Sequence, residues 1–258
     1  MPGTGNLANE VIIVGAHYDH LGMGQFGSLA PWTVAIHNGA DDNASGTAGI
    51  LELAWRLLRR QSENRRAILL IAFSGEEMGL LGSEYYCKNP LVPLDSTIAM
   101  VNLDMVGRLS THGRVEVYGV DTAQEFRPSL SNFARSLSIQ TEFHPDGYGP
   151  SDHATFHQRD IPVLHFFTGL HKDYHRPSDD FDKVDTDGLS KICDLVELAV
   201  WQLATNPDRP KPTSPATSFS LEGSLLSDID LSRPRGLGIR LKRAKSGEGF
   251  QIVGFQNA

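Results

Sequence analysis

Five apolar runs recur along the first 167 residues of the chain, and polar or helix-like segments separate them. The runs are 11–16, 67–73, 97–106, 115–120 and 161–167, and most of them are rich in valine, isoleucine or leucine. Continuous apolar runs of this kind are typical of strands that are buried on both faces of a sheet. We therefore expect five strands in a sheet that is covered by helices.

Between these runs, apolar side chains repeat at helical spacing in residues 48–58, 129–137 and 189–204. Asn43 and Ser45 precede the first of these segments and are candidates for its N-cap. Strands that alternate with helices predict an α/β fold, here a three-layer sandwich around a mixed, largely parallel central sheet. In such sheets, functional side chains gather beyond the carboxyl ends of the strands.

The character of the chain changes at about residue 206. Residues 207–225 are rich in proline, serine and threonine, which indicates a linker. Residues 226–258 contain two short strand patterns, and about thirty residues are too few to form a robust core alone. We therefore predict a main domain at 1–206, a linker at 207–225 and a small partial segment at 226–258.

Composition excludes some classes of protein. The chain has 23 Lys and Arg against 31 Asp and Glu, a formal net charge of −8, so it lacks the overall basic charge typical of nucleic-acid binding. We expect no nucleic-acid partner and no membrane span, because the longest apolar runs have the length of strands. Cys87 and Cys193 lie in helix-like segments, and we interpret them as buried thiols.

Side chains that bind metals stand at the ends of several predicted elements. They are His17, Asp42, the adjacent pair Glu76 and Glu77, Asp104 and His175. Each position alone has an ordinary explanation, such as a polar strand end or a helix cap. Together, two imidazoles and three carboxylate positions at one sheet edge match a pair of divalent cations, with zinc the best fit. The sequence contains no GxSxG, HExxH or phosphate-loop motif that would indicate other chemistry.

Six motifs in order carry a family resemblance: GAHYDHLG, NGADDNASG, FSGEEMGLLGS, NLDMVGR, SDHATF and DYHRPSDD. Over residues 11–205 the chain resembles the co-catalytic di-zinc aminopeptidases, which include bacterial leucyl aminopeptidases and aminopeptidase Y and are related to glutamate carboxypeptidases. The resemblance implies two zinc ions per chain. His17 and Asp104 would hold one ion, Glu77 and His175 would hold the other, and Asp42 would bridge them.

The resemblance also implies the catalytic roles. Glu76 would act as the general base on a water between the two ions, while Glu77 binds metal, which explains the adjacent pair. Asp19 would orient the His17 imidazole, and Tyr174 would help to polarise the scissile carbonyl. Asp152 and Asp179 are implied as supporting residues.

The implied activity is that of a zinc-dependent exopeptidase that removes N-terminal residues from peptides with a free N-terminus. Three alternatives stay open: glutaminyl cyclisation at a single zinc, carboxypeptidase or dipeptidase specificity, and a non-catalytic binding module. The family also favours a secreted or periplasmic protein. Residues 226–258 resemble the opening strands of a PDZ domain, so we expect a fragment of a longer peptidase–PDZ protein. Phe156, Phe166 and Phe167 are candidates for an apolar pocket, and we expect at least two of them to pack in the core instead.

Overall fold

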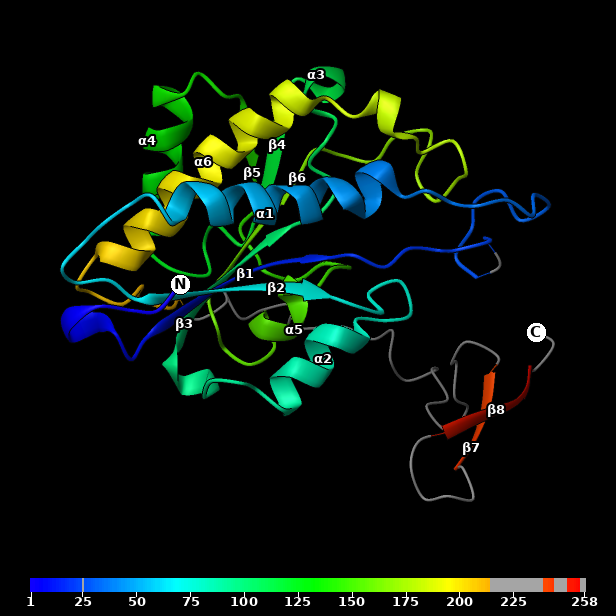
Figure 1. Cartoon of the computed structure of the whole chain (residues 1–258), viewed down its shortest axis with the longest axis horizontal. Helices are drawn as coiled ribbons and strands as arrows, with labels where there is room; N and C mark the ends of the chain where they lie inside the picture. The colour runs from blue at the N-terminus through cyan, green and yellow to red at the C-terminus, as the bar shows by residue number, and fades with distance from the viewer. Residues whose placement is uncertain (25, 214–238, 244–249, 256–258) are drawn as a thin grey trace, which may run out of the picture. The chain divides into compact units, whose positions relative to one another are not determined.

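A computed structural model describes residues 1–24, 26–213, 239–243 and 250–255 (Figure 1). The chain divides into two compact units, Met1–Ala216 and Thr217–Ala258. In the second unit, strands β7 (Ile239–Arg243) and β8 (Phe250–Phe255) pair in antiparallel fashion, where the two strand patterns were expected. The resemblance to a PDZ domain stays a prediction, because most of that segment lies outside the described residues.

A six-stranded sheet forms the centre of the first unit. Its strands are β1 (Val11–His17), β2 (Ala67–Phe73), β3 (Thr97–Leu103), β4 (Val115–Tyr118), β5 (Thr141–Phe143) and β6 (Val163–Phe167). They lie in the order β2-β1-β3-β6-β4-β5, and only β4 and β6 are antiparallel neighbours. The mixed, largely parallel sheet is therefore confirmed. The sequence did not predict β5, which has three residues and no apolar run.

Helices cover both faces of the sheet. They are α1 (Gly46–Leu57), α2 (Leu81–Lys88), α3 (Leu109–His112), α4 (Phe126–Ser136), α5 (His153–His157) and α6 (Thr186–Thr205). Figure 1 shows α1, α4 and α6 on one side of the sheet and α2 and α5 on the other, which makes three layers. The helix-like segment expected around Cys87 is α2, whereas the sequence did not predict the short helices α3 and α5, whose few residues carry no extended apolar stripe.

The alternation of side chains along β1 explains why this strand is apolar throughout. Ile12 and Val14 pack into the cluster formed with α1 and α6, whereas Val11 and Ile13 pack into a second cluster on the other face. All seven residues of β1 are buried, so both faces need apolar side chains. The strand is therefore held rigidly, and its last residue, His17, is fixed at the carboxyl edge of the sheet.

The described part of the predicted linker, residues 207–213, lies along the first unit. Arg209 forms an ion pair with Glu10 at 2.5 Å, and the backbone nitrogen of Lys211 donates to the Glu125 carboxylate. The isolated bridge between Ala123 and Pro212 continues this contact. Residues 214–225 of the predicted linker lie outside the described residues.

Cys87 and Cys193 are both buried and free. Burial raises the pKa of the Cys87 thiol to about 11 and that of Cys193 to about 12, so both remain protonated at neutral pH. Phe156 and Phe166 are buried in the two core clusters, as expected for two of the three candidate pocket residues. Among the described helices, none has both the length and the apolar character required to cross a membrane.

Candidate metal centre

The carboxyl ends of four neighbouring parallel strands carry the predicted site residues. His17 is the last residue of β1, Asp104 directly follows β3, and Glu76 and Glu77 come three and four residues after β2. His175 lies eight residues beyond the end of β6. Because β2, β1, β3 and β6 are adjacent and parallel, these segments leave the sheet at the same edge.

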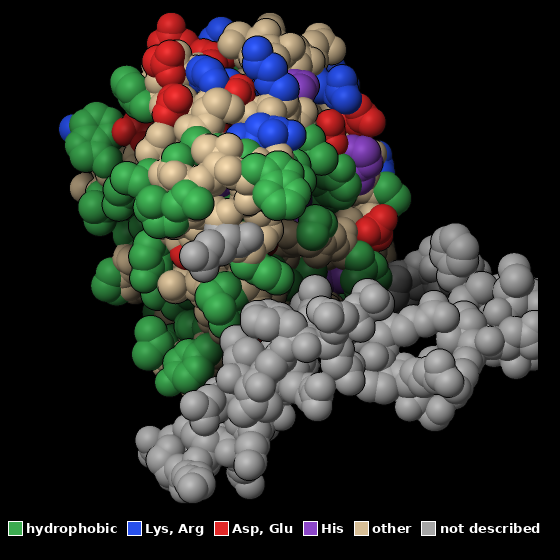
Figure 2. All heavy atoms as spheres, turned by 90° about the vertical axis from the view of Figure 1, so that its right-hand side faces the viewer, with side chains coloured by type: hydrophobic (Ala, Val, Ile, Leu, Met, Phe, Trp, Pro, Cys, Tyr) green, Lys and Arg blue, Asp and Glu red, His purple; other side chains and the backbone are tan. Residues whose placement is uncertain are grey.

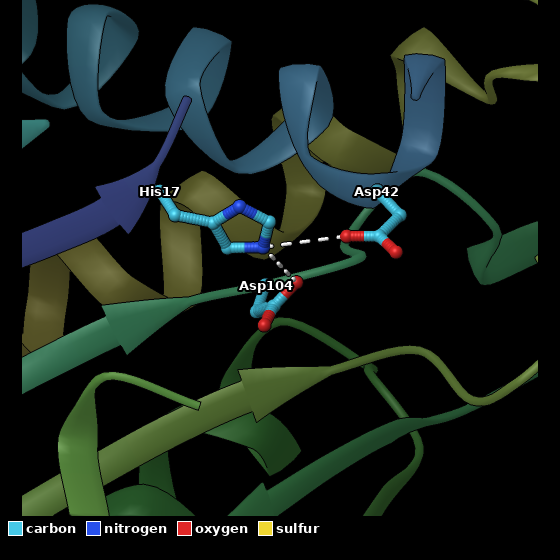
Figure 3. A group of neighbouring side chains, drawn as sticks. All are labelled: His17, Asp42 and Asp104. Atoms are coloured by element: carbon cyan, nitrogen blue, oxygen red, sulfur yellow. Dashed lines mark ion pairs between the residues drawn. The ribbon is translucent and has the colours of Figure 1, made fainter. Parts of the chain in front are cut away.

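One group of possible ligands is formed by His17, Asp42 and Asp104 (Figure 3). The Nε2 atom of His17 lies 3.3 Å from Oδ1 of Asp42 and 3.4 Å from Oδ1 of Asp104. Nδ1 of His17 is 3.1 Å from the backbone oxygen of Asp19, to which it donates when it carries the proton. That contact leaves Nε2 free to face the two carboxylates.

A second group surrounds the other oxygen of Asp42. Nε2 of His175 lies 3.2 Å from Oδ2 of Asp42 and 3.1 Å from Oε2 of Glu77. Nδ1 of His175 is 2.8 Å from the backbone oxygen of Gly27, which orients the ring in the same manner as His17. Asp42 therefore presents one oxygen to each group, the arrangement that a bridging ligand requires.

His20 also belongs to this second group, and the sequence analysis did not select it. Its Nδ1 atom lies 2.7 Å from Oε1 of Glu77 and 4.0 Å from Oδ2 of Asp42. These three residues place one ligand-type atom each within 4.8 Å of one another. The signal in the sequence was the second histidine of the HYDH motif, whose side chain could be placed only once the loop after β1 was known.

The residues fit a pair of divalent cations. Oδ1 of Asp104 is buried and makes no hydrogen bond with the described residues, and the close neighbour of Oε1 of Glu77 is an imidazole nitrogen of His20, itself a metal-ligand type. Carboxylates and imidazoles that converge in this way are residue types that bind zinc in proteins. We therefore regard the two groups as a candidate dinuclear centre.

The electrostatics of the site also favour a bound cation. Burial would lower the pKa of His175, but hydrogen bonds to Asp42 and Glu77 outweigh burial and raise its pKa to about 10. For His17 as well, burial is outweighed by Asp104, Asp42 and Glu76, and the pKa lies above its ordinary value. Without a cation, protons on the imidazoles balance the carboxylates, and a divalent cation would displace these protons.

The adjacent glutamates occupy different environments. Burial would raise the pKa of Glu77, but contacts with His175 and His20 lower it to about 2. Glu76 instead borders an open cavity, with Oε2 3.9 Å from Nε2 of His17. Burial, together with the charges of Asp104 and Asp152, raises the pKa of Glu76 to about 9. A nearby cation would favour the carboxylate and lower this value.

A buried network fixes the backbone of Asp42. Oδ2 of Asp179 accepts hydrogen bonds from the backbone nitrogens of Asp41 at 2.8 Å and Asp42 at 3.0 Å. The other oxygen of Asp179 accepts from Arg108 at 2.8 Å. The carboxylate of Asp41 turns away from the metal groups, accepting from the backbone nitrogen of Gly107 at 2.6 Å. Of the two adjacent aspartates, Asp41 therefore supports the backbone, and Asp42 faces the ligand-type histidines.

The carboxylate of Asp104 is held in place by hydrogen bonds with Ser151 and, through it, Asn102. The Ser151 hydroxyl donates to Oδ2 of Asp104 at 2.7 Å, and the Asn102 amide donates to Ser151 at 2.8 Å. The next residue, Asp152, is fully buried, and neither of its oxygens has a hydrogen-bond partner among the described residues. Burial raises the pKa of Asp152 to about 6.

Tyr174 borders the same cavity as Glu76. Its ring stacks on His175, with centroids 3.8 Å apart and an interplanar angle of 23°. Burial and the surrounding carboxylates raise the pKa of the Tyr174 hydroxyl, so it remains a proton donor. The structure thus brings Tyr174 to the cavity, near Glu76.

The loop between β1 and α1 forms part of the rim of the site, because Gly27 contacts His175 and the backbone nitrogen of Leu29 donates to the His175 carbonyl. This loop exposes Trp32, which is 96% accessible, and Val34. Figure 2 views the molecule from the right-hand side of Figure 1, where β1 and β2 end, and hydrophobic side chains cover much of the described surface there.

Comparisons with known proteins identify the family. The chain matches the profile of Peptidase family M28 over residues 1–200, and it belongs to that family. It is 28% identical over 236 residues to leupeptin-inactivating enzyme 1 of Streptomyces exfoliatus, covering 83% of this chain and 49% of the relative. It is 31% identical over 212 residues to aminopeptidase YwaD of Bacillus subtilis, covering 78% and 43%.

Solved structures give the same fold. BSAP, a zinc aminopeptidase from Bacillus subtilis, aligns with a TM-score of 0.62 and 28% identity over 80% of this chain and 49% of BSAP. Glutaminyl cyclase from Porphyromonas gingivalis aligns with a TM-score of 0.61 and 21% identity, covering 73% and 72%, and that likeness concerns the fold alone. The chain spans about half the length of the curated relatives described above.

Proposed function

We propose that this protein is a zinc-dependent aminopeptidase that binds two zinc ions and removes N-terminal residues from peptides. The observation that carries the proposal is the position of Asp42, whose two oxygens face His17 and His175 separately. A single-metal site needs no carboxylate in that position. The relatives named aminopeptidase support the choice of substrate, and they favour it over glutaminyl cyclisation, carboxypeptidase or dipeptidase activity.

Bound zinc would supply positive charge that acidifies a water and stabilises negative charge on the substrate carbonyl. Glu76 is the free carboxylate at the cavity, since Glu77 is engaged by His20 and His175. We assign Glu76 the role of general base. It accepts a proton from the water whose oxygen attacks the carbonyl carbon, and it returns that proton to the amine nitrogen as the C–N bond breaks.

Two further residues complete the mechanism. The Tyr174 hydroxyl, kept protonated by its surroundings, would donate to the carbonyl oxygen as negative charge develops there. Asp19 would position the reacting groups, because its carboxylate accepts from the backbone nitrogens of Glu76 at 3.1 Å and Glu77 at 3.3 Å. The side chain of Asp19 therefore acts on both glutamates, while its backbone oxygen contacts His17.

The experiment is a peptide cleavage panel in which each peptide has either a free or an acetylated N-terminus. Each is incubated with zinc-loaded protein and with protein treated with a chelator. We expect release of the first residue only from free N-termini and only with zinc. Release from the carboxyl end would reassign the substrate class, and inactivity of protein that holds two zinc ions would refute the proposed function.

A further inference from the structure

A cavity with a volume of about 280 Å³ adjoins the candidate metal centre. Glu76 and Asp104 line one side of it. Away from the metal groups it is lined by Tyr118, His153, His165, Phe167 and Leu170. A pocket next to the reacting carbonyl is where a substrate side chain would lie. The unusual feature of this pocket is that two imidazoles stand among its aromatic and aliphatic walls.

The two imidazoles form a stacked pair. The rings of His153 and His165 are 4.1 Å apart between centroids, with an interplanar angle of 4°. Burial, with a smaller contribution from His157, lowers the pKa of His153 to about 3. Burial also lowers the pKa of His165 well below its ordinary value. Both rings are therefore neutral at physiological pH, and each carries one N–H donor and one nitrogen acceptor.

Hydrogen bonds that begin at the metal centre fix the proton of His165. Ser151 has a single hydroxyl proton and gives it to Asp104, so it must accept from the amide of Asn102. The same amide nitrogen lies 3.2 Å from Nδ1 of His165 and donates its second proton there. Nδ1 is thus an acceptor, and the proton of the neutral ring is on Nε2.

His153 is buried with neither ring nitrogen hydrogen-bonded to any described residue. Its exposed fraction is 0%, and it lines the cavity next to Gly149. A Cβ atom at position 149 would lie only 2.9 Å from Nε2 of His153, so glycine there leaves room beside the ring. Buried polar atoms without partners are costly, and a ligand that supplies the partners recovers this cost.

We propose that the stacked pair His153–His165 selects substrates whose N-terminal side chain is a neutral hydrogen-bonding group, such as the amide of glutamine or asparagine. This inference rests on the proposed aminopeptidase function. An amide has both a donor and an acceptor and matches two neutral imidazoles. An aliphatic side chain of the same shape would give the ring nitrogens no partner. A carboxylate would bring a charge into the pocket beside Asp104 and Glu76.

The test compares pairs of peptides that differ only in the first residue and are similar in size, glutamine with methionine and asparagine with leucine. The ratio of kcat/KM within each pair is measured for the wild type, for His165→Phe and for His157→Phe. His157 lies on the same helix as His153 but does not line the cavity, which makes it the matched control. Ratios are used because they cancel any uniform loss of activity.

We expect the wild type and His157→Phe to favour glutamine and asparagine, and His165→Phe to shift both ratios towards methionine and leucine by at least about fivefold. Ratios that agree within twofold between the wild type and His165→Phe would overturn the inference. In a third pair of peptides, which begin with glutamine and glutamate, a preference of the wild type for glutamate would overturn it as well.

A binding measurement separates this inference from the proposed function. Calorimetry on the zinc-loaded wild type compares free glutamine with free methionine as products that occupy the same pocket. Tighter binding of glutamine supports the selective pocket, and equal or weaker binding contradicts it. If no peptide is cleaved, the proposed function fails, and the comparison of the two amino acids still decides what the pocket recognises.

Discussion

The Asp19 carboxylate accepts a hydrogen bond from the backbone nitrogen of Glu76 at 3.1 Å. This contact joins the loop after β1 to the loop after β2, which are 57 residues apart in the chain. The other oxygen of Asp19 lies 3.3 Å from the backbone nitrogen of Glu77. The carboxylate of Asp19 thus fixes the backbone of both glutamates. The side chain of Glu76 borders the cavity, and that of Glu77 contacts His20 and His175.

Replacement of Asp19 by alanine should lower kcat/KM about 10–100-fold, the usual cost of losing a residue that orients metal ligands. The reason is that the backbone of Glu76 and Glu77 loses its acceptor. Asp182→Ala removes an exposed acid outside the site and serves as the control. Steady-state kinetics at saturating zinc measure the effect. Equal activity of Asp19→Ala and Asp182→Ala would contradict this role.

The adjacent glutamates should give opposite phenotypes when each is changed to glutamine. We expect Glu76→Gln to retain two zinc ions but to lose activity by about 10²–10⁴-fold, because the general base is gone. We expect Glu77→Gln to bind one ion weakly, because Glu77 contacts His20 and His175. The zinc content after dialysis and the rate of peptide cleavage distinguish the two variants. Normal turnover by Glu76→Gln would refute the mechanism.

His20 and His175 should differ in their effect on zinc binding. His175 contacts both Asp42 and Glu77 within 3.2 Å, and we expect His175→Ala to lose the second ion. His20 is 2.7 Å from Glu77 but 4.0 Å from Asp42, so we expect His20→Ala to lower the affinity for the second ion about 10–100-fold while the ion at His17 stays bound. Zinc titration by calorimetry resolves the two sites. Loss of both ions in His20→Ala would contradict this assignment.

Zinc should stabilise the protein more at pH 8 than at pH 6. In the metal-free protein, the pKa of His175 is raised to about 10, so its charged form stabilises the fold below about pH 6.5, and this contribution is lost as the pH rises towards 10. Zinc requires the neutral imidazole, so its affinity rises by about tenfold per pH unit for each proton displaced. The zinc-induced shift in Tm should therefore increase with pH, because zinc competes with the same proton.

Thermal unfolding with and without zinc at a series of pH values checks this. His175→Ala is the control, and its zinc-induced shift in Tm should vary less with pH. A shift in the wild type that is independent of pH would show that zinc binding displaces no protons.

Arg108 should be important for stability. Its guanidinium group is buried, donates to Asp179 at 2.8 Å and lies 3.8 Å from carboxylate oxygens of both Asp41 and Asp173. We expect Arg108→Met to lower the free energy of unfolding by about 3–5 kcal/mol, because buried carboxylates lose their counter-charge. Arg114, half exposed with partners at the surface, is the control, and Arg114→Met should cost less than about 1 kcal/mol. Equal urea midpoints for the two variants would contradict the prediction.

The sequence by itself determined the five apolar strands of the sheet and the residues at their ends. The run 11–16 is apolar because both faces of β1 are covered, and that pattern is local, whereas the edge strand β2 is apolar but only partly buried. The parallel arrangement of alternating strands and helices then places His17, Asp104 and the Glu76–Glu77 pair at one edge. The order of the motifs was sufficient to indicate the family, which the profile match confirms.

Only the tertiary structure decided how side chains from distant loops meet. His20 approaches Glu77 because the loops after β1 and β2 are joined by Asp19, and Asp179 reaches the backbone of Asp42 from 137 residues away. The stacking of His153 on His165 depends on how α5 packs against the sheet. Such contacts depend on packing between segments far apart in the chain, and periodicity along the chain carries no information about them. The sequence therefore determined the longer elements and the kind of chemistry, whereas the fold decided which ligand-type groups converge and which groups line the pocket.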